Sequence, residues 1–173
     1  MMLFTTFDSP LGELLLTGEE SVTAPGGLAL AALSVPDQKG AVGIQPEWRH
    51  APAAFAEAER QLAAFFAGEL RSFDLEYSAG AAKGTAFREK VWAALDDIPY
   101  GETTSYGQLA QRIGASRAAV RAIGGAVGAN PLLVFRPCHR VIGADGSLTG
   151  YAGGLERKRL LLGLERERAG SRR

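Results

Sequence analysis

The first half of the chain alternates between short apolar runs and clusters of turn residues, a pattern typical of a small sheet with one helix. Asp8-Ser9-Pro10 separates two apolar runs, which predicts a hairpin. Further along, Phe55, Leu62 and Phe65 recur at helical spacing. The expected elements of this half are strands at residues 3–7, 11–17, 28–35 and 73–77 and a helix at 52–67, none with obvious chemistry of its own.

The second half is expected to be mostly helical and to follow a linker rich in Ala and Gly, residues 78–84. Thr85 is placed to cap a helix that stops before Pro99. Ser105 and Gln108 have the spacing of a capping box. The other expected elements are helices at 106–113, 117–128 and 155–165, and strands at 141–142 and 148–149 on either side of an Asp-Gly turn.

The helices expected at 106–113 and 117–128 are joined by a Gly-containing turn, and together they indicate a helix-turn-helix. Ser116 is expected to cap the second of them. That helix has few of the side chains that read base edges in a major groove, but it is rich in Ala and Gly. Such small residues allow close approach either to a DNA backbone and minor groove or to another helix.

Composition limits the classes of protein that the chain can belong to. With 173 residues, 46% hydrophobic and 22% charged, it is long enough for one large domain or two small ones. A single cysteine excludes an intramolecular disulfide framework, and Cys138, His50 and His139 are too few for a four-ligand zinc site of cysteine and histidine. There is no basic leader and no apolar run of membrane-spanning length, so a cytoplasmic protein without a membrane segment is expected.

The zero net charge conceals a separation between the halves. Residues 1–83 carry 5 Lys and Arg against 11 Asp and Glu, whereas residues 84–173 carry 14 against 8. Such an asymmetry suggests that the basic half meets a polyanion. Together with the small-residue helix, it favours non-specific DNA binding over an ordinary scatter of surface charge.

The candidate nucleophile is Cys138, which lies between Pro137 and His139. Proline stiffens the segment, and a thiol beside an imidazole is the smallest unit of an activated sulfur nucleophile. The alternative is an inert buried cysteine that packs as a small hydrophobe.

Several motifs occur in a fixed order over residues 84–165. They are Gly84-Thr85-Ala86-Phe87, Ile98-Pro99-Tyr100-Gly101-Glu102-Thr103-Thr104-Ser105-Tyr106, Asn130-Pro131, Pro137-Cys138-His139-Arg140-Val141-Ile142-Gly143 and Gly150-Tyr151-Ala152-Gly153-Gly154-Leu155. Together they resemble one family, the O6-alkylguanine-DNA alkyltransferases of the bacterial single-chain type, also called methylated-DNA–protein-cysteine methyltransferases. The resemblance implies an α+β protein of two domains: a ribonuclease-H-like α/β domain at residues 1–79, a winged helix-turn-helix domain at 80–168, and a tail at 169–173.

The resemblance also implies roles at matching positions. Cys138 would accept the alkyl group, His139 would act as base through a bridging water molecule, and Glu165 would orient the imidazole. Asn130 would tie the recognition helix to the active-site segment. The base pocket would be lined by Tyr106, Val141, Tyr151, Ala152 and Lys158. DNA would be contacted by Arg121, which fills the gap in the duplex, and by Arg117, Ser105, Arg140, Ala119, Ala122 and Gly125.

The expected reaction is irreversible transfer of an alkyl group from O6-alkylguanine in double-stranded DNA to Cys138, with O4-alkylthymine left open as a second substrate. A free thiol has a pKa of about 8.5, so in-line substitution requires a base. The reacting atom lies within the duplex, so the nucleotide must be flipped out. Nothing in the sequence could hydrolyse the thioether product, so each molecule acts once. No cofactor or metal is expected, and the protein is expected to act as a monomer, with clustering on DNA left open.

Two features depart from the family pattern. Arg136 stands where an apolar residue is usual; its charge could point to DNA, pair with an acidic residue of the first half, or change the pKa of the thiol. The turn at residues 114–121 lacks the usual proline and is one residue longer, which leaves open whether Arg121 or Arg117 enters the duplex. The competing interpretations are a non-catalytic lesion-binding protein, a DNA-binding redox sensor and, less favoured, a cysteine protease.

Overall fold

The computed structural model describes residues 1–82 and 84–170, which divide into two compact units, 1–82 and 84–170. The predicted boundary fell at 79/80, and residues 78–84 were expected to be a linker. Instead, Ser78 donates its N–H to the Leu30 carbonyl and accepts the N–H of Ala81 at its hydroxyl, which starts a one-turn helix, α2 (Ala79–Ala82). Of the expected tail, residues 171–173 lie outside the described residues, and Ala169 and Gly170 belong to the last helix.

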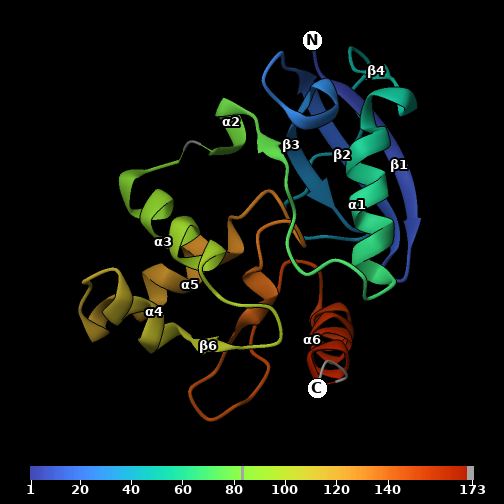
Figure 1. Ribbon diagram of the computed structural model, residues 1–173. Coiled ribbons are helices and arrows are strands. Elements are labelled where there is room, and N and C mark those ends of the chain that lie inside the picture. Colours follow the sequence, from blue (N-terminus) through green and yellow to red (C-terminus); the bar gives the residue numbers. More distant parts are fainter. Residues whose placement is uncertain (83, 171–173) are drawn as a thin grey trace. The chain divides into compact units, whose positions relative to one another are not determined.

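The first unit is a mixed five-stranded sheet with the order β4-β1-β2-β3-β5 (Figure 1). The antiparallel pairing of β1 with β2 confirms the predicted hairpin, β3 also pairs with β2 in antiparallel fashion, and both edge strands add in parallel. Helix α1 (Ala56–Phe66), preceded by a 3₁₀ turn at Pro52–Phe55, packs its apolar stripe on the sheet. The strands are β1 (Leu3–Ser9), β2 (Gly12–Glu20), β3 (Leu28–Ser34), β4 (Arg49–His50) and β5 (Glu76–Tyr77).

The strand predicted at 73–77 is wrong over its first three residues. The side chain of Gln61, on α1, accepts the N–H of Asp74 at 2.8 Å and donates to its carbonyl at 3.0 Å. Since both backbone groups of Asp74 are already bonded, the sheet ladder begins only at Glu76.

The second unit is built on four main helices, α3 (Ala86–Asp96), α4 (Tyr106–Arg112), α5 (Val120–Gly128) and α6 (Leu155–Gly170). Two of the predicted caps are confirmed: Thr85 accepts the N–H of Arg88, and Ser105 and Gln108 form a reciprocal capping box. Helices α3 and α4 both pack on α5 (Figure 1). The indole N–H of Trp92 donates to the carbonyl of Ala126 at 2.9 Å, which ties α3 to α5.

The helix predicted from residue 117 begins three residues later. Arg117–Ala119 form a 3₁₀ turn closed by the Ala119 N–H on the carbonyl of Ser116, and the Ser116 side chain makes no capping bond within the described residues. Helix α5 therefore starts at Val120, which leaves Arg121 in its first turn and Arg117 outside it.

After Cys138, the strand predicted at residues 141–142 is confirmed, but its predicted pairing with a strand at 148–149 is wrong. Strand β7 (Val141–Ile142) pairs in parallel with β6 (Thr104–Ser105), and residues 148–149, which the structure describes, form no strand. The Asp-Gly turn is present, closed by the Gly143 N–H on the carbonyl of Ser147. However, the carbonyl of Thr149 accepts from the ammonium group of Lys158 at 2.8 Å, so the returning chain is held by a side chain rather than by β7.

None of the helices within the described residues is long and apolar enough to span a membrane. Helix α6 continues five residues beyond the predicted end at 165 and packs its last turn on Gly101, which has φ +81°. A Cβ atom at Gly101 would lie 2.6 Å from the Cβ of Ala169.

We therefore expect Gly101→Ala to lower the free energy of unfolding by about 2 kcal/mol, because alanine is strained at positive φ and collides with α6. The matched control is Gly163→Ala inside α6, where nothing lies within 4 Å of the added atom. It should stabilise the protein by about 0.5–1 kcal/mol. Urea unfolding of both variants measures the difference, and equal stabilities would contradict the packing of α6 on this turn.

Candidate active site

Cys138 begins a 3₁₀ turn, Cys138–Arg140, at the end of a tightly folded loop. Its N–H donates to the carbonyl of Arg136 at 2.7 Å, and the Arg140 N–H donates to that of Pro137. The thiol is only 3% exposed. Neighbouring residues on an extended strand would point to opposite faces, so this turn is what allows Cys138 and His139 to contribute to one site.

Asn130 organises the loop that leads to Cys138. Its Oδ1 accepts from the Leu132 N–H and from Nη1 of Arg136, both at 3.0 Å. Its Nδ2 donates to the carbonyls of Leu132 and Arg136. Because Asn130 lies two residues after the end of α5 and is buried, this one amide connects the end of the helix to the segment that carries the thiol.

His139, Arg140 and Glu165 form one buried polar cluster. Nε2 of His139 lies 2.7 Å from Oε2 of Glu165, and Arg140 donates to both carboxylate oxygens at 2.8 and 2.9 Å. The third guanidinium bond, from Nη1 of Arg140 to the carbonyl of Ile98, is 2.6 Å. The carboxylate thus joins α6 to the Cys138–Arg140 turn, and Arg140 extends the connection to the end of α3.

The charges of this cluster determine where the proton of His139 resides. Burial alone would raise the pKa of Glu165, but hydrogen bonds from His139 and Arg140 outweigh it and hold this pKa at about 2. Burial lowers the pKa of His139 despite the carboxylate. Since ionised Glu165 can only accept, the imidazole is neutral with its proton on Nε2. The lone pair is on Nδ1, a buried atom without a hydrogen-bond partner among the described residues.

Burial raises the pKa of the Cys138 thiol to about 11. Hydrogen bonding from Asn130 and the positive charges of Lys158 and Arg136 oppose this rise. The thiol is therefore protonated at neutral pH, and a base is required to form the thiolate.

Lys158 and its loop lie beside the thiol. The Lys158 side chain, which is fully buried, donates to the carbonyls of Thr149 and Gly150 at 2.8 and 3.1 Å. The hydroxyl of Tyr106 also points to the Thr149 carbonyl, at 3.4 Å. Tyr151 comes directly after Gly150 in the chain. Its hydroxyl is buried without a hydrogen-bond partner among the residues described, and burial holds its pKa well above 10.

The short parallel ladder of β6 and β7 places Tyr106 and Val141. Thr104 pairs with Val141 and Ser105 with Ile142, and α4 begins with Tyr106 at the next position. The predicted pocket residues Tyr106, Val141, Tyr151 and Lys158 thus come from segments that these contacts hold around the Cys138 turn. Ala152, the fifth, is half-buried in the same loop as Tyr151.

The residues predicted to contact DNA differ in how far their side chains are exposed. Arg121, Ala122 and Gly125 are exposed on one face of α5, and Arg117 is exposed in the preceding turn. Ala119 and Ser105 are half-buried near these helix starts. Arg140 is the exception, because it is 7% exposed and its guanidinium is bonded to Glu165 and Ile98. For Arg140, the expected DNA contact is therefore corrected to a role inside the site. The sequence around Arg140 did not indicate this role, because its partner Glu165 is distant in the chain.

Arg136 is a further member of the site that motif reasoning did not place. The side chain is buried, with its guanidinium 4.7 Å from the centre of the Trp92 ring. Of the three expected alternatives, the structure supports the effect on the thiol, since the Arg136 charge lowers the pKa of Cys138. The sequence signal was the charge itself, at a position where the family usually has an apolar residue.

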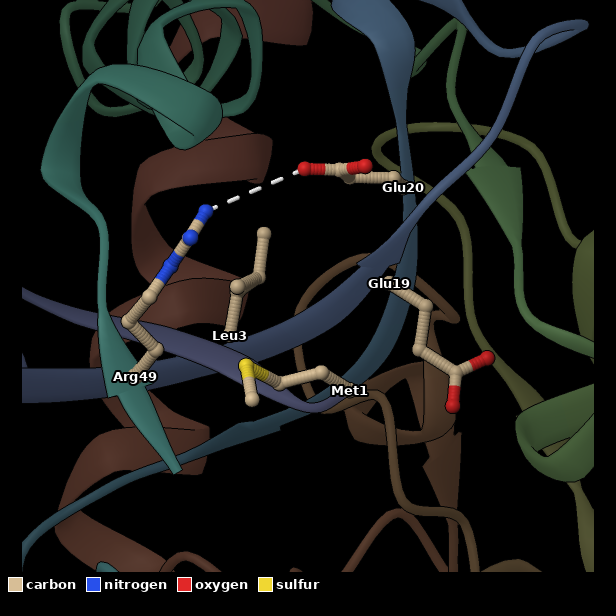
Figure 2. Close-up of a pocket in the computed structure, with 5 residues that line it drawn as sticks. All are labelled: Met1, Leu3, Glu19, Glu20 and Arg49. Atoms are coloured by element: carbon tan, nitrogen blue, oxygen red, sulfur yellow. Dashed lines mark ion pairs between the residues drawn. The ribbon is translucent and has the colours of Figure 1, made fainter. Parts of the chain in front are cut away.

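A hollow of about 450 Å³ in the first unit is lined by Met1, Leu3, Glu19, Glu20 and Arg49 (Figure 2). Arg49 and Glu20 form an ion pair of 3.8 Å there, but both side chains are largely exposed. Such an exposed pair contributes little, and neither cysteine nor histidine lines the hollow. The site of interest is therefore the Cys138 cluster.

Comparison with known proteins agrees with this location. Residues 86–167 match the family model "6-O-methylguanine DNA methyltransferase, DNA binding domain". The methylated-DNA–protein-cysteine methyltransferase of Mycolicibacterium paratuberculosis is 49% identical over 96% of this chain and 93% of its own length. The chain belongs to the methylated-DNA–protein-cysteine methyltransferases. The constitutive family member of Bacillus subtilis is 45% identical, with 96% of each chain covered.

Solved structures of the family share the fold of this methyltransferase. Mycobacterium tuberculosis OGT in complex with DNA matches with a TM-score of 0.84 and 48% identity, covering 96% of this chain and 94% of that one. The predicted α+β fold, an N-terminal sheet domain followed by a helical DNA-binding domain, is confirmed.

The low pKa of Glu165 generates a prediction about acid stability. A depressed pKa in the folded state contributes stability above the ordinary value of 4.5, and this contribution is lost as pH falls toward 2. We expect Glu165→Gln to be less stable than the parent near neutral pH, and the gap in unfolding free energy to narrow by about 3 kcal/mol on acidification. Glu167→Gln, at an exposed position of α6, controls for the loss of one charge. A gap that stays constant would show that Glu165 is not held ionised by its partners.

Proposed function

We propose that this protein repairs double-stranded DNA by moving an alkyl group from O6 of guanine to the sulfur of Cys138, once per molecule. The observation that supports this most is the buried cluster beside Cys138, in which a neutral His139 presents an Nδ1 atom without a partner among the described residues. Glu165 holds the other imidazole nitrogen, and Arg140 in turn bonds to Glu165. Membership of the methyltransferase family supports the choice of substrate.

In the proposed reaction His139 removes the thiol proton through a bridging water molecule. The pKa of Cys138 is about 11, so few molecules carry a thiolate without a base. Glu165 fixes the imidazole and stabilises the imidazolium that forms, while Arg140 keeps Glu165 ionised. Lys158 contributes positive charge that favours the thiolate.

The substitution forms the sulfur–carbon bond as the carbon–oxygen bond to guanine breaks. The bonding electrons leave with guanine, which requires a proton or a hydrogen-bond donor. Tyr106 and Lys158 are the donors proposed for this, since both already lie at the Thr149 carbonyl beside the Cys138 turn. The product is a thioether on Cys138, and the repaired guanine returns to the duplex.

The proposed DNA surface is the exposed face of α5. Its small side chains at Ala122 and Gly125 would allow close approach to the backbone and minor groove, and the proposal assigns to Arg121, exposed in the first turn of α5, entry into the space of the flipped nucleotide. We also propose that the protein acts as a monomer in the cytoplasm, where DNA is accessible and the lone thiol stays reduced.

The direct test is to incubate the protein with a duplex containing one O6-methylguanine in excess reductant and to measure peptide masses. We expect one methyl group on the peptide of Cys138, saturating at one per molecule, and no gain in Cys138→Ser. Tight lesion binding without added mass would favour a lesion-binding protein. A change on Cys138 that reductant reverses would favour a redox sensor.

If Arg121 replaces the flipped nucleotide, its role should depend on the duplex. Unstacking costs a few kcal/mol, so Arg121→Ala is expected to slow methyl transfer about tenfold or more on duplex DNA. It should change the rate less than about twofold on a single strand, where no stacked partner has to be replaced. Arg117→Ala is the matched comparison. A larger duplex-specific loss in that variant would assign the role to Arg117 instead.

A further inference from the structure

The buried Arg136 lies close to both the thiol and Asn130. Its carbonyl accepts the N–H of Cys138 at 2.7 Å, and its guanidinium lies over Trp92 of α3. A buried guanidinium is costly unless it is compensated, and here the aromatic face and the Asn130 side chain compensate it.

Arg136 bonds to both ends of one amide. Its Nη1 donates to Oδ1 of Asn130 at 3.0 Å, and its carbonyl accepts from Nδ2 of the same side chain at 3.2 Å. A rotated amide would turn its NH₂ group toward the guanidinium, where two donors would oppose each other. Arg136 therefore acts together with the Leu132 N–H, which also donates to Oδ1, in fixing which way the Asn130 amide points.

We propose that Arg136 is a positioning residue for alkyl transfer, which helps to hold the Asn130 amide with Oδ1 on the guanidinium and Nδ2 on the side of Cys138, and which places a permanent positive charge behind that amide. This inference rests on the proposed function. A charged donor on Oδ1 polarises the amide and strengthens the hydrogen bonds that Nδ2 makes. The guanidinium remains charged throughout the range in which a thiol titrates.

Other charged and titratable groups also act on this thiol. Lys158 faces it from α6 and Tyr151 from the loop before α6, while Asp96 at the end of α3 interacts with Arg136. Asn130 and Arg136 both hold the pKa of Cys138 below the value that burial alone would produce. Arg136 thus acts on the thiolate from the loop that precedes Cys138, whereas His139 and Glu165 follow Cys138 in the chain.

The test compares the parent with Arg136→Met, a neutral side chain of similar length that can still pack on Trp92. Because Cys138 is the only cysteine, the rate of iodoacetamide labelling against pH reports this thiol alone. Methyl transfer from the O6-methylguanine duplex is measured over the same pH range. Each of the two profiles, labelling rate and transfer rate against pH, has a midpoint that reports ionisation of the thiol. We expect both midpoints to rise by about one pH unit in Arg136→Met, and the transfer rate at pH values below the midpoint to fall about tenfold.

Three further variants test whether the effect comes from the charge of Arg136, whether it depends on the Asn130 amide, and whether loss of any positive charge would produce it. Arg136→Lys keeps the charge and should shift the midpoint by less than half as much. In an Asn130→Ala background the Arg136→Met shift should also fall below half, because the amide that transmits it is gone. Arg166→Met, at an exposed site of α6, should leave both profiles unchanged. If circular dichroism shows Arg136→Met unfolded, Arg136→Gln is scored by the same criteria.

The possible failures are distinguishable. Equal midpoints for the parent and the neutral Arg136 variant overturn the inference while leaving the proposed function intact if the parent transfers methyl groups. A full shift in the Asn130→Ala background also overturns it, since Arg136 would then act without the amide. A parent protein that transfers nothing from the duplex overturns the proposed function, and the iodoacetamide profiles still decide whether Arg136 acts on Cys138.

Discussion

The buried carboxylate of Glu165 is the interaction on which the rest of the site depends. It is 1% exposed and accepts hydrogen bonds from both His139 and Arg140. A buried charge is tolerated only when it is paired and hydrogen-bonded, so α6 and the Cys138–Arg140 turn must stay together. Arg140 extends this requirement to the carbonyl of Ile98, where α3 has just ended.

Burial has opposite consequences for the two groups that would exchange a proton. It raises the pKa of the Cys138 thiol and lowers that of the His139 imidazole, so both are neutral at rest. A neutral thiol is a weak nucleophile toward solvent oxidants, which suits a residue that the proposed reaction uses only once. The positive charges of Lys158 and Arg136, together with Asn130, reduce the free energy needed to form the thiolate.

In the proposed function, one part of the second unit contacts DNA and another part recognises the base. Helix α5 offers Arg121 and an exposed row of small residues, which have few atoms to read base edges. Selectivity for an alkylated guanine would then come from the pocket around Tyr106, Tyr151 and Lys158. Those residues are held by contacts to the Thr149–Gly150 backbone rather than by the helix.

Features that depend on neighbours in the chain could be predicted from the sequence. The hairpin around Asp8-Ser9-Pro10, the cap at Thr85 and the capping box at Ser105 need only residues two to four positions away. The choice of Cys138 and His139 as candidate groups also needed only their adjacency, and the family resemblance supplied Glu165.

Features that depend on distant partners were decided by the tertiary structure. The strand at 73–77 was shortened by Gln61, and the expected strand at 148–149 was replaced by a contact with Lys158. Arg140 turned inward because Glu165, 25 residues away in the chain, offered it both carboxylate oxygens. A backbone group or guanidinium takes the partner that lies nearest in space, and sequence alone determined the donors and acceptors but not which of them would meet.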